Sequence, residues 1–429
     1  MKKLQLWAAI ITATAMFAMN ANEARAVDGD LLVGFTSIQK SLAGAGVANS
    51  EGAGAIAINP AGIVDVGHQS NVTVGGMIPY PGYTGINTGF IAPGQFTSDQ
   101  NFFPEAAFFY NQPIDAESAF AVGIYANGGL GTSIFAPFNK NTGTPGVFGT
   151  GVVGINLFQA FISAGYAHRF GNVSVGVAPI FAVQRFNAWG VAPFAAFSIT
   201  PSAVSNQGYD WGVGVGLRAG MEWNIVPGLR FALAGATPVV FSELSLYRGL
   251  LPDQGTFNAP ATITAGAAWD VSPNITLLFD YKHIFFADVA AFGNSSQIPP
   301  LLGSMKGPGF RWRDMNVFTI AGEWRINPAW TLRAGYARNN TVVRPQDIVF
   351  NILAPVITTD HISAGFSYRV TEDSFIDTSA TLSPRRNLSG TVPAGFGGGT
   401  VNLTAWVFEA SIGWTYKFNT TPAPVFAKY

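Results

Sequence analysis

A two-residue alternation of side chains is the feature that most restricts the fold of this chain. Across residues 211–223, apolar side chains occupy the odd positions, while glycine or charged residues such as Arg218 and Glu222 occupy the even positions. Residues 406–418 alternate in the same way. A helix repeats every 3.6 residues and cannot place these two sets on opposite faces, whereas a β-strand repeats every two. The pattern therefore predicts strands with one apolar face and one small or polar face.

The composition favours a membrane as the surroundings of these strands. Hydrophobic residues make up 48% of the 429 residues and charged residues 11%, against about 25% charged residues in a typical soluble domain. No run of about 18 apolar residues follows residue 20, which excludes a bundle of transmembrane helices. The net charge of −1 leaves no basic surface for nucleic acid. A transmembrane β-barrel or an unusually apolar secreted β protein remains.

The spacing of the candidate strands distinguishes these two possibilities. Short connections that carry Gly, Asn, Pro or Asp alternate with long ones, as in bacterial outer-membrane barrels, whose short turns face the periplasm and whose long loops face outward. We therefore predict an all-β fold, a transmembrane antiparallel β-barrel of fourteen strands. The expected strands are residues 69–79, 104–112, 118–126, 159–170, 173–187, 209–223, 229–241, 261–270, 275–283, 317–326, 330–338, 361–370, 374–382 and 406–418.

The two ends of the chain add three further regions to the barrel of residues 69–418. Residues 1–26 have the basic start, apolar middle and Ala24-Arg25-Ala26 site of a cleaved signal peptide, which directs the chain to export. Residues 27–68 are small and apolar, unlike a solvated linker. Because a fourteen-strand barrel is wider than one that side chains alone can fill, we expect this segment to act as a hatch that plugs the lumen. Residues 419–429 form a tail after Phe418 whose role stays open.

Motifs in and after the expected hatch resemble those of the outer-membrane long-chain fatty acid transport family, which includes importers of aromatic hydrocarbons. The Ala-Gly-Ala-Gly stretch at 43–46 and Asn59-Pro60-Ala61-Gly62 resemble the hatch of that family, and residues 127–132 and 413–418 resemble a loop start and the last strand. The resemblance covers essentially the whole mature chain. It implies a monomeric, plugged barrel in the bacterial outer membrane that is inserted by the barrel-assembly machinery and surrounded by outer-membrane lipid and lipopolysaccharide.

The resemblance also implies a route for hydrophobic small molecules. They enter from outside, bind in the lumen, and leave sideways into the membrane through a gap beside an inward-kinked third strand. Hatch residues Gly44, Gly46, Asn59, Pro60, Ala61 and Gly62 are the expected gate. Gly123, Gly128 and Gly129 are the glycines that would let the third strand bend away from its neighbour.

Two further sets of residues fit the capture and binding of such molecules. The connection 127–158 is too apolar for a solvated loop, so we expect an external capture groove, although plain packing on the barrel rim would explain the same residues: Leu130, Phe135, Phe138, Phe148, Leu157 and Phe158. If the substrate is a fatty acid, an inward-facing cation must meet its carboxylate, and we take Arg185, Lys282 and Arg333 as candidates.

The sequence thus predicts a channel for passive uptake of hydrophobic compounds, either long-chain fatty acids or aromatic and aliphatic hydrocarbons. A general water-filled diffusion porin is the alternative. None of the four histidines lies in a recognisable nucleophile motif and the chain has no cysteine, so we expect neither an enzyme nor a metal site, and no cofactor. Which hydrophobic substrate is taken up is not decided by these residues.

Overall fold

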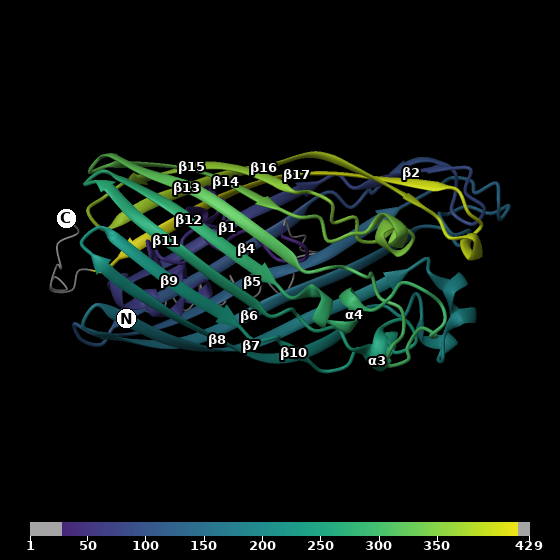
Figure 1. Ribbon diagram of the computed structural model, residues 1–429, viewed down its shortest axis with the longest axis horizontal. Helices are drawn as coiled ribbons and strands as arrows, with labels where there is room; N and C mark the ends of the chain where they lie inside the picture. The colour runs from purple at the N-terminus through teal and green to yellow at the C-terminus, as the bar shows by residue number, and fades with distance from the viewer. Residues whose placement is uncertain (1–27, 419–429) are drawn as a thin grey trace.

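The computed structural model describes residues 28–418, and its dominant feature is a closed antiparallel β-barrel (Figure 1). The expected signal peptide and the tail lie outside the described residues. Strand β1 pairs with both β4 and β17, which closes the ring, and the remaining neighbours follow in chain order. The fourteen strands of the wall are β1 (Gln69–Pro79), β4 (Phe103–Pro113), β5 (Ser118–Ile134), β6 (Val153–Phe170), β7 (Val173–Trp189), β8 (Asp210–Val226), β9 (Leu229–Ala236), β11 (Thr262–Ser272), β12 (Ile275–Ile284), β13 (Met315–Asn327), β14 (Trp330–Asn339), β15 (Asp360–Arg369), β16 (Ser374–Thr391) and β17 (Thr400–Lys417).

The prediction of a fourteen-strand barrel is confirmed, and the alternation of side chains is the reason the wall forms. On β8, Gly212 and Gly214 are buried on the inner face, whereas Val213 and Val215 are 67% and 58% exposed on the outer face. The outer face of β8 is apolar along its length, which fits contact with lipid. None of the helices within residues 28–418 is long and apolar enough to cross a membrane.

Several strands are longer or shorter than predicted, for local reasons. The expected strand 229–241 ends at Ala236, because Pro238 cannot donate to the ladder; β10 (Val240–Phe241) resumes the pairing with β8. Strand β5 runs on to Ile134 through glycines that read as a loop. Strand β16 extends to Thr391 past an irregularity between Ser383 and Arg386. The extended end of β17 also pairs with β2 (Gly82–Ile86), which pairs with β3 (Gly94–Thr97).

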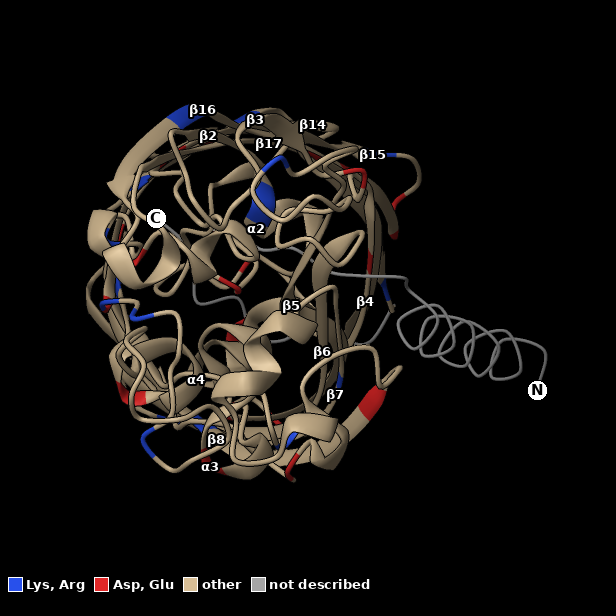
Figure 2. Ribbon diagram, turned by 90° about the vertical axis from the view of Figure 1, so that its right-hand side faces the viewer, with Lys and Arg blue, Asp and Glu red and all other residues tan. Residues whose placement is uncertain are grey.

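The long connections gather at one end of the barrel, and Figure 2 looks onto that end. They contain short helices: η3 (Ala192–Phe197), η4 (Pro201–Ala203), η5 (Ser245–Tyr247), α3 (Pro252–Gly255), η6 (Phe286–Asp288), α4 (Ala290–Gly293), η7 (Pro345–Asp347), η8 (Phe350–Ile352) and η9 (Ala394–Phe396). Residues 28–68 contain α2 (Ser37–Ser41), η1 (Ala53–Ala57) and η2 (Pro60–Asp65), and they contact inward-facing residues of strands around the wall.

Candidate functional site

A cavity of about 80 Å³ lies between the N-terminal segment and the inner face of the barrel. Leu31 to Val33, Phe35, Ala57 and Ile58 line it from the segment. The wall contributes mainly apolar residues from β6, β7 and β9, such as Phe161, Ile180 and Ala234. Two cations, Arg218 on β8 and Lys282 on β12, also line it. The cavity is therefore an apolar site with positive charge at its border, a combination that suits an amphipathic anion.

Arg218 stands out among the cations of the lumen because it has no carboxylate partner among the described residues. Its side chain is 8% exposed, and one guanidinium nitrogen donates a hydrogen bond of 3.1 Å to the Tyr125 hydroxyl. Tyr125 is itself within 3.0 Å of the Ser163 hydroxyl. A buried charge that meets only neutral groups is costly. An anionic ligand in the cavity would remove that cost, although the sequence-based candidates did not include Arg218.

The three predicted carboxylate partners lie in three different places. Lys282 lines the cavity and donates to Asp28 at 2.5 Å. Arg333 donates to Glu323 and to the Ser367 hydroxyl, both at 2.6 Å. Arg185 lies on the outer face of β7 near the long-loop end, with its guanidinium 4.4 Å from the centre of the Tyr209 ring. The structure therefore brings only Lys282 to the cavity.

The turn at residues 43–47 is held to the barrel wall by Asp280. The backbone N–H groups of Gly46 and Val47 donate to its carboxylate at 2.8 and 3.0 Å. Gly44 adopts a left-handed φ of +83°, and a Cβ atom there would lie 2.2 Å from the Val33 carbonyl oxygen. The small residues of the Ala-Gly-Ala-Gly stretch are thus required by a close approach of backbone to backbone.

Asn59 begins η2 as its N-cap and ties two parts of the segment together. Its side-chain oxygen accepts from the Ala61 N–H at 3.1 Å, and its amide donates to the Val47 carbonyl at 2.8 Å. Pro60 stands at the first position of the helix, where its missing N–H costs nothing. A Cβ atom at Gly62 would lie 1.6 Å from the Ser50 hydroxyl oxygen. The four residues of the motif therefore form one packed turn.

Glycines of the wall make room for this turn, and they are site residues that the sequence did not single out. A Cβ atom at Gly220 would lie 2.1 Å from the Asn59 side-chain oxygen, and one at Gly176 would lie 2.4 Å from the Pro60 carbonyl carbon. Both belong to the inward set of small residues on β7 and β8. Their inward direction could be predicted from the alternation, but their contact with η2 could not.

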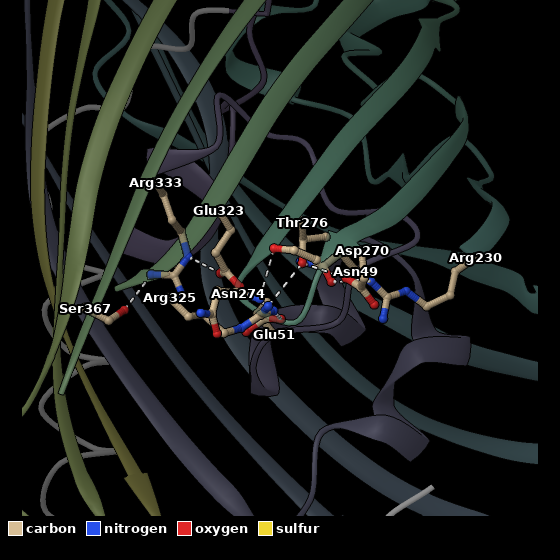
Figure 3. A network of polar contacts seen from close by, with 11 residues as sticks. Asn49, Glu51, Arg230, Asp270, Asn274, Thr276, Glu323, Arg325, Arg333 and Ser367 are labelled. Atoms are coloured by element: carbon tan, nitrogen blue, oxygen red, sulfur yellow. Dashed lines mark hydrogen bonds and ion pairs between the residues drawn. The ribbon is translucent and has the colours of Figure 1, made fainter. Parts of the chain in front are cut away.

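Polar networks fix other parts of the segment to the wall. Lys40 of α2 is buried and pairs with Glu105 on β4 and Glu409 on β17. In Figure 3, Asn49 accepts from Arg230 on β9 at 3.2 Å, and Glu51 pairs with Arg325 on β13 at 3.4 Å. These contacts reach strands on different sides of the barrel.

The third strand of the wall, β5, is irregular near Gly128. Its register shifts between Ala126 and Gly128, and its pairing with β4 runs only from Ala119 to Tyr125. Beyond Tyr125 the N-terminal segment takes the place of β4. The Leu32 N–H donates to the Asn127 carbonyl at 3.1 Å, and the Gly129 N–H donates to the Asp30 carbonyl at 2.8 Å.

Gly128 and Gly129, two of the three glycines expected at the kink, lie at this junction. Gly128 has a φ of +159°, and a Cβ atom there would lie 1.8 Å from the Asp30 carbonyl oxygen. Gly123 precedes the kink in the strand and faces the Phe109 ring. The Asp30 side chain is buried with no hydrogen-bond partner among the described residues, and burial raises its pKa to about 7.

The residues of the predicted capture groove do not share one exposed surface. Leu130, Phe148 and Leu157 are buried in the apolar cluster at the long-loop end, and Phe158 is buried in a separate cluster with Leu32 and Phe103. Phe135 and Phe138 are exposed, at 42% and 61%.

Aromatic rings from five long connections meet at the same end of the barrel. Phe148 and Phe194 have ring centres 5.1 Å apart, and Phe90 lies 5.4 Å from Phe148. Phe350 lies 5.4 Å from Phe194, and Phe396 lies 6.1 Å from Phe194. We call these five residues the aromatic cluster. Phe90, Phe350 and Phe396 were missed because each is a single ring in a loop without a pattern.

Within residues 28–418 no group of three or more His, Asp or Glu side chains is arranged to hold a metal ion. The site therefore consists of an apolar cavity, a buried arginine, a packed N-terminal segment and a kinked strand. A closed fourteen-strand antiparallel barrel with an apolar outer face has the architecture of outer-membrane β-barrel proteins.

Comparisons with known proteins specify this class further. A model of the family described as Outer membrane protein transport protein (OMPP1/FadL/TodX) matches residues 240–389. By sequence, no curated protein matches the chain. The predicted resemblance to the long-chain fatty acid transport family is confirmed by this match and by the fold. That family consists of transport channels of the Gram-negative outer membrane rather than enzymes.

Three solved structures share the fold at low sequence identity. The Pseudomonas putida toluene transporter TodX is 17% identical, with a TM-score of 0.66 over 91% of this chain and 100% of that chain. A FadL homologue of Pseudomonas aeruginosa is 14% identical, with a TM-score of 0.69 over the same shares. The Ralstonia pickettii toluene transporter TbuX is 19% identical, with a TM-score of 0.60 over 90% of this chain and 99% of that chain.

Proposed function

We propose that this protein is an outer-membrane channel for the passive uptake of hydrophobic compounds, and that hydrophobic carboxylates of the long-chain fatty acid type are its preferred substrates. The observation that carries the choice of substrate is Arg218, a buried cation without a carboxylate partner among the described residues, at the border of an apolar cavity. Two of the similar structures are toluene transporters. A monoaromatic hydrocarbon is therefore the competing substrate, but it would leave the Arg218 charge unmatched.

Capture at the outside is the first step of the proposed route. The aromatic cluster is only partly covered, and Phe135 and Phe138 of the connection 127–158 are exposed. Apolar surface of this kind at the outer end binds hydrophobic molecules that neither lipopolysaccharide headgroups nor water dissolves well. The substrate then moves down its own concentration gradient, so the barrel needs no energy source.

Residues 28–68 act as the hatch and gate in this proposal. The cavity of about 80 Å³ is smaller than a cavity of ~150 Å³ known to hold benzene. Its occupation by a larger ligand therefore requires movement of residues that line it. Residues 30–33 are the part of the segment suited to move, because they are held to β5 by two backbone hydrogen bonds, at Asp30 and Leu32, whereas the buried Lys40 ion pairs anchor α2.

Sideways release follows from the same movement. The edge of β5 beyond Tyr125 is not paired with β4, and residues 30–32 occupy that edge. Displacement of these residues would connect the cavity to the membrane between the two strands. Gly128 allows the close approach that keeps this exit closed at rest.

Binding of matched ligands to the purified protein tests the proposal. We expect the free fatty acid to bind roughly 10- to 150-fold more tightly than its methyl ester, as a charge-assisted hydrogen bond provides. In Arg218→Met this preference should disappear, while Arg248→Gln, which alters an exposed arginine in a loop, should retain it. Equal binding of acid and ester to the unaltered protein would show that the carboxylate is not recognised. Binding of toluene alone would then identify a hydrocarbon channel.

A further inference from the structure

A notch lies at the long-loop end of the barrel, beyond the first residue of β15. Strand β15 begins at Asp360, whereas its neighbour β16 continues far beyond it to Thr391. The gap between β14 and the extension of β16 forms a groove of about 670 Å³. Arg338, Asn340 and Thr341 line one side of it, and Arg386 and Asn387 line the other. The groove is separate from the substrate cavity, with which it shares no lining residue.

The charge of this notch is positive. Arg338 and Arg386 share one carboxylate, that of Asp360, at 3.5 and 2.5 Å. The two side chains remain 65% and 43% exposed, and Arg385 beside them is exposed as well. Exposed ion pairs hold their partners weakly, so these arginines stay available to a further anion. Figure 2 shows the basic stretch on β16 at the outer rim.

An apolar strip lies directly beneath the notch on the outer face of the wall. Phe318 pairs with Arg338 across β13 and β14, and it is 52% exposed. Ile362 and Leu382 face each other across β15 and β16 and are also exposed. Because long loops of such barrels face outward, the notch lies at the level of the outer-leaflet headgroups and the strip at the level of the acyl chains.

We propose that this notch binds the phosphorylated sugar headgroup of an outer-leaflet glycolipid, with the acyl chains of that lipid along the strip. Arg338 and Arg386 bind a phosphate group, because guanidinium groups match phosphate oxygens in geometry and charge. The exposed Asn387 side chain, whose oxygen accepts from Thr404, has an amide NH2 group that can donate to a hydroxyl of the sugar. The apolar strip favours a lipid over a free anion, which would contact the notch alone.

Lipid binding in nanodiscs tests this site on the full-length protein. The probe is diphosphorylated lipid A, and native mass spectrometry counts the lipid molecules that the protein retains. We expect the Arg338→Gln/Arg386→Gln double variant to bind lipid A roughly 30-fold more weakly, as loss of two cations near a membrane surface predicts. Lys140→Gln, an exposed lysine in a different loop, is the matched control and should bind like the unaltered protein.

Two further comparisons define the occupant. Dephosphorylated lipid A should bind the unaltered protein as weakly as diphosphorylated lipid A binds the double variant. Inorganic phosphate at millimolar concentration should not displace the intact lipid. Equal retention of lipid A by the double variant and the unaltered protein would overturn the proposal, and so would displacement by phosphate alone. Uptake of the channel substrate should be unchanged in the double variant, because neither arginine lines the cavity.

Discussion

Arg218 differs in its hydrogen-bond partner from these other cations of the lumen: Lys40, Arg230, Lys282, Arg325 and Arg333. Each of them pairs with a carboxylate of the chain. Arg218 meets a tyrosine hydroxyl, which is a neutral acceptor. The paired cations therefore have a structural role, and Arg218 is the cation proposed to bind the carboxylate of the substrate.

Asp30 should make docking of the N-terminal segment depend on pH. Burial raises its pKa from 3.8 to about 7, so the docked carboxyl stays protonated where an exposed one is ionised. Docking should therefore be strongest below about pH 4, weaken as the pH rises toward 7, and change little above that. Amide exchange of residues 28–33, corrected for intrinsic rates, measures this.

The matched variant for Asp30 is Asp30→Asn, which is neutral throughout. Its corrected exchange rates should not change between pH 4 and pH 8, because no ionisation opposes docking. A pH profile in the variant identical to that of the unaltered protein would show that another group titrates.

Asn59 should matter for uptake more than for assembly. Asn59→Ala removes the N-cap of η2 and the bond to Val47, which together position Ala57 and Ile58 at the cavity. The cap alone is worth about 1–2 kcal/mol. We expect reduced fatty acid uptake by cells and normal heat-modifiable migration of the folded barrel on gels. Asn172→Ala, in an exposed turn, serves as the control, and normal uptake by an assembled Asn59→Ala barrel would contradict the role of the turn.

At the scale of elements, the kink of β5 depends on the absence of a side chain at one position. Gly128→Val would place a Cβ atom 1.8 Å from the Asp30 carbonyl oxygen, so residues 30–32 must leave the edge of β5. Amide protection of Gly129 and Leu32 should fall at least tenfold, which corresponds to about 1.4 kcal/mol. Protection of residues 119–125, which pair with β4, should persist.

Gly322, where an added Cβ atom has no close neighbours within the described residues, provides the control for the Gly128→Val variant. A Cβ atom at Gly322 meets nothing closer than 3.6 Å, so Gly322→Ala should leave the protection of Gly129 unchanged. If Gly128→Val keeps full protection at Leu32, the contact at the kink does not hold the segment in place.

For the whole molecule, the packed interior predicts little ionic current. Residues 28–68 contact strands around the wall, and the cavity beside them is small. In planar bilayers the purified protein should show at most brief, small openings, compared with a general porin under the same salt conditions. A large, steady conductance would favour the alternative of a water-filled diffusion channel.

The wall of the barrel was more predictable from sequence than its contents. Strand β1 lies at the predicted residues 69–79, because a two-residue alternation is a local property of the chain. The extension of β5 past Gly128 was missed, since glycines that permit a kink also resemble a loop. The alternation places Arg218 on the small or polar face of its strand, but its lack of a carboxylate partner among the described residues depends on which strands are neighbours. The notch above β15 likewise depends on the unequal ends of three strands.

The position of α2 couples closure of the barrel to the segment inside it. Strands β1 and β17 form the seam where the first and last parts of the wall meet. Lys40 reaches Glu409 on one side of this seam and Glu105 on the other, and Ser37 contacts Ser411 of β17 at 2.8 Å. Because the partners of Lys40 belong to strands on both sides of this seam, its ion pairs are complete only when β1 and β17 have paired. Closure of the barrel and burial of this paired lysine therefore stabilise each other.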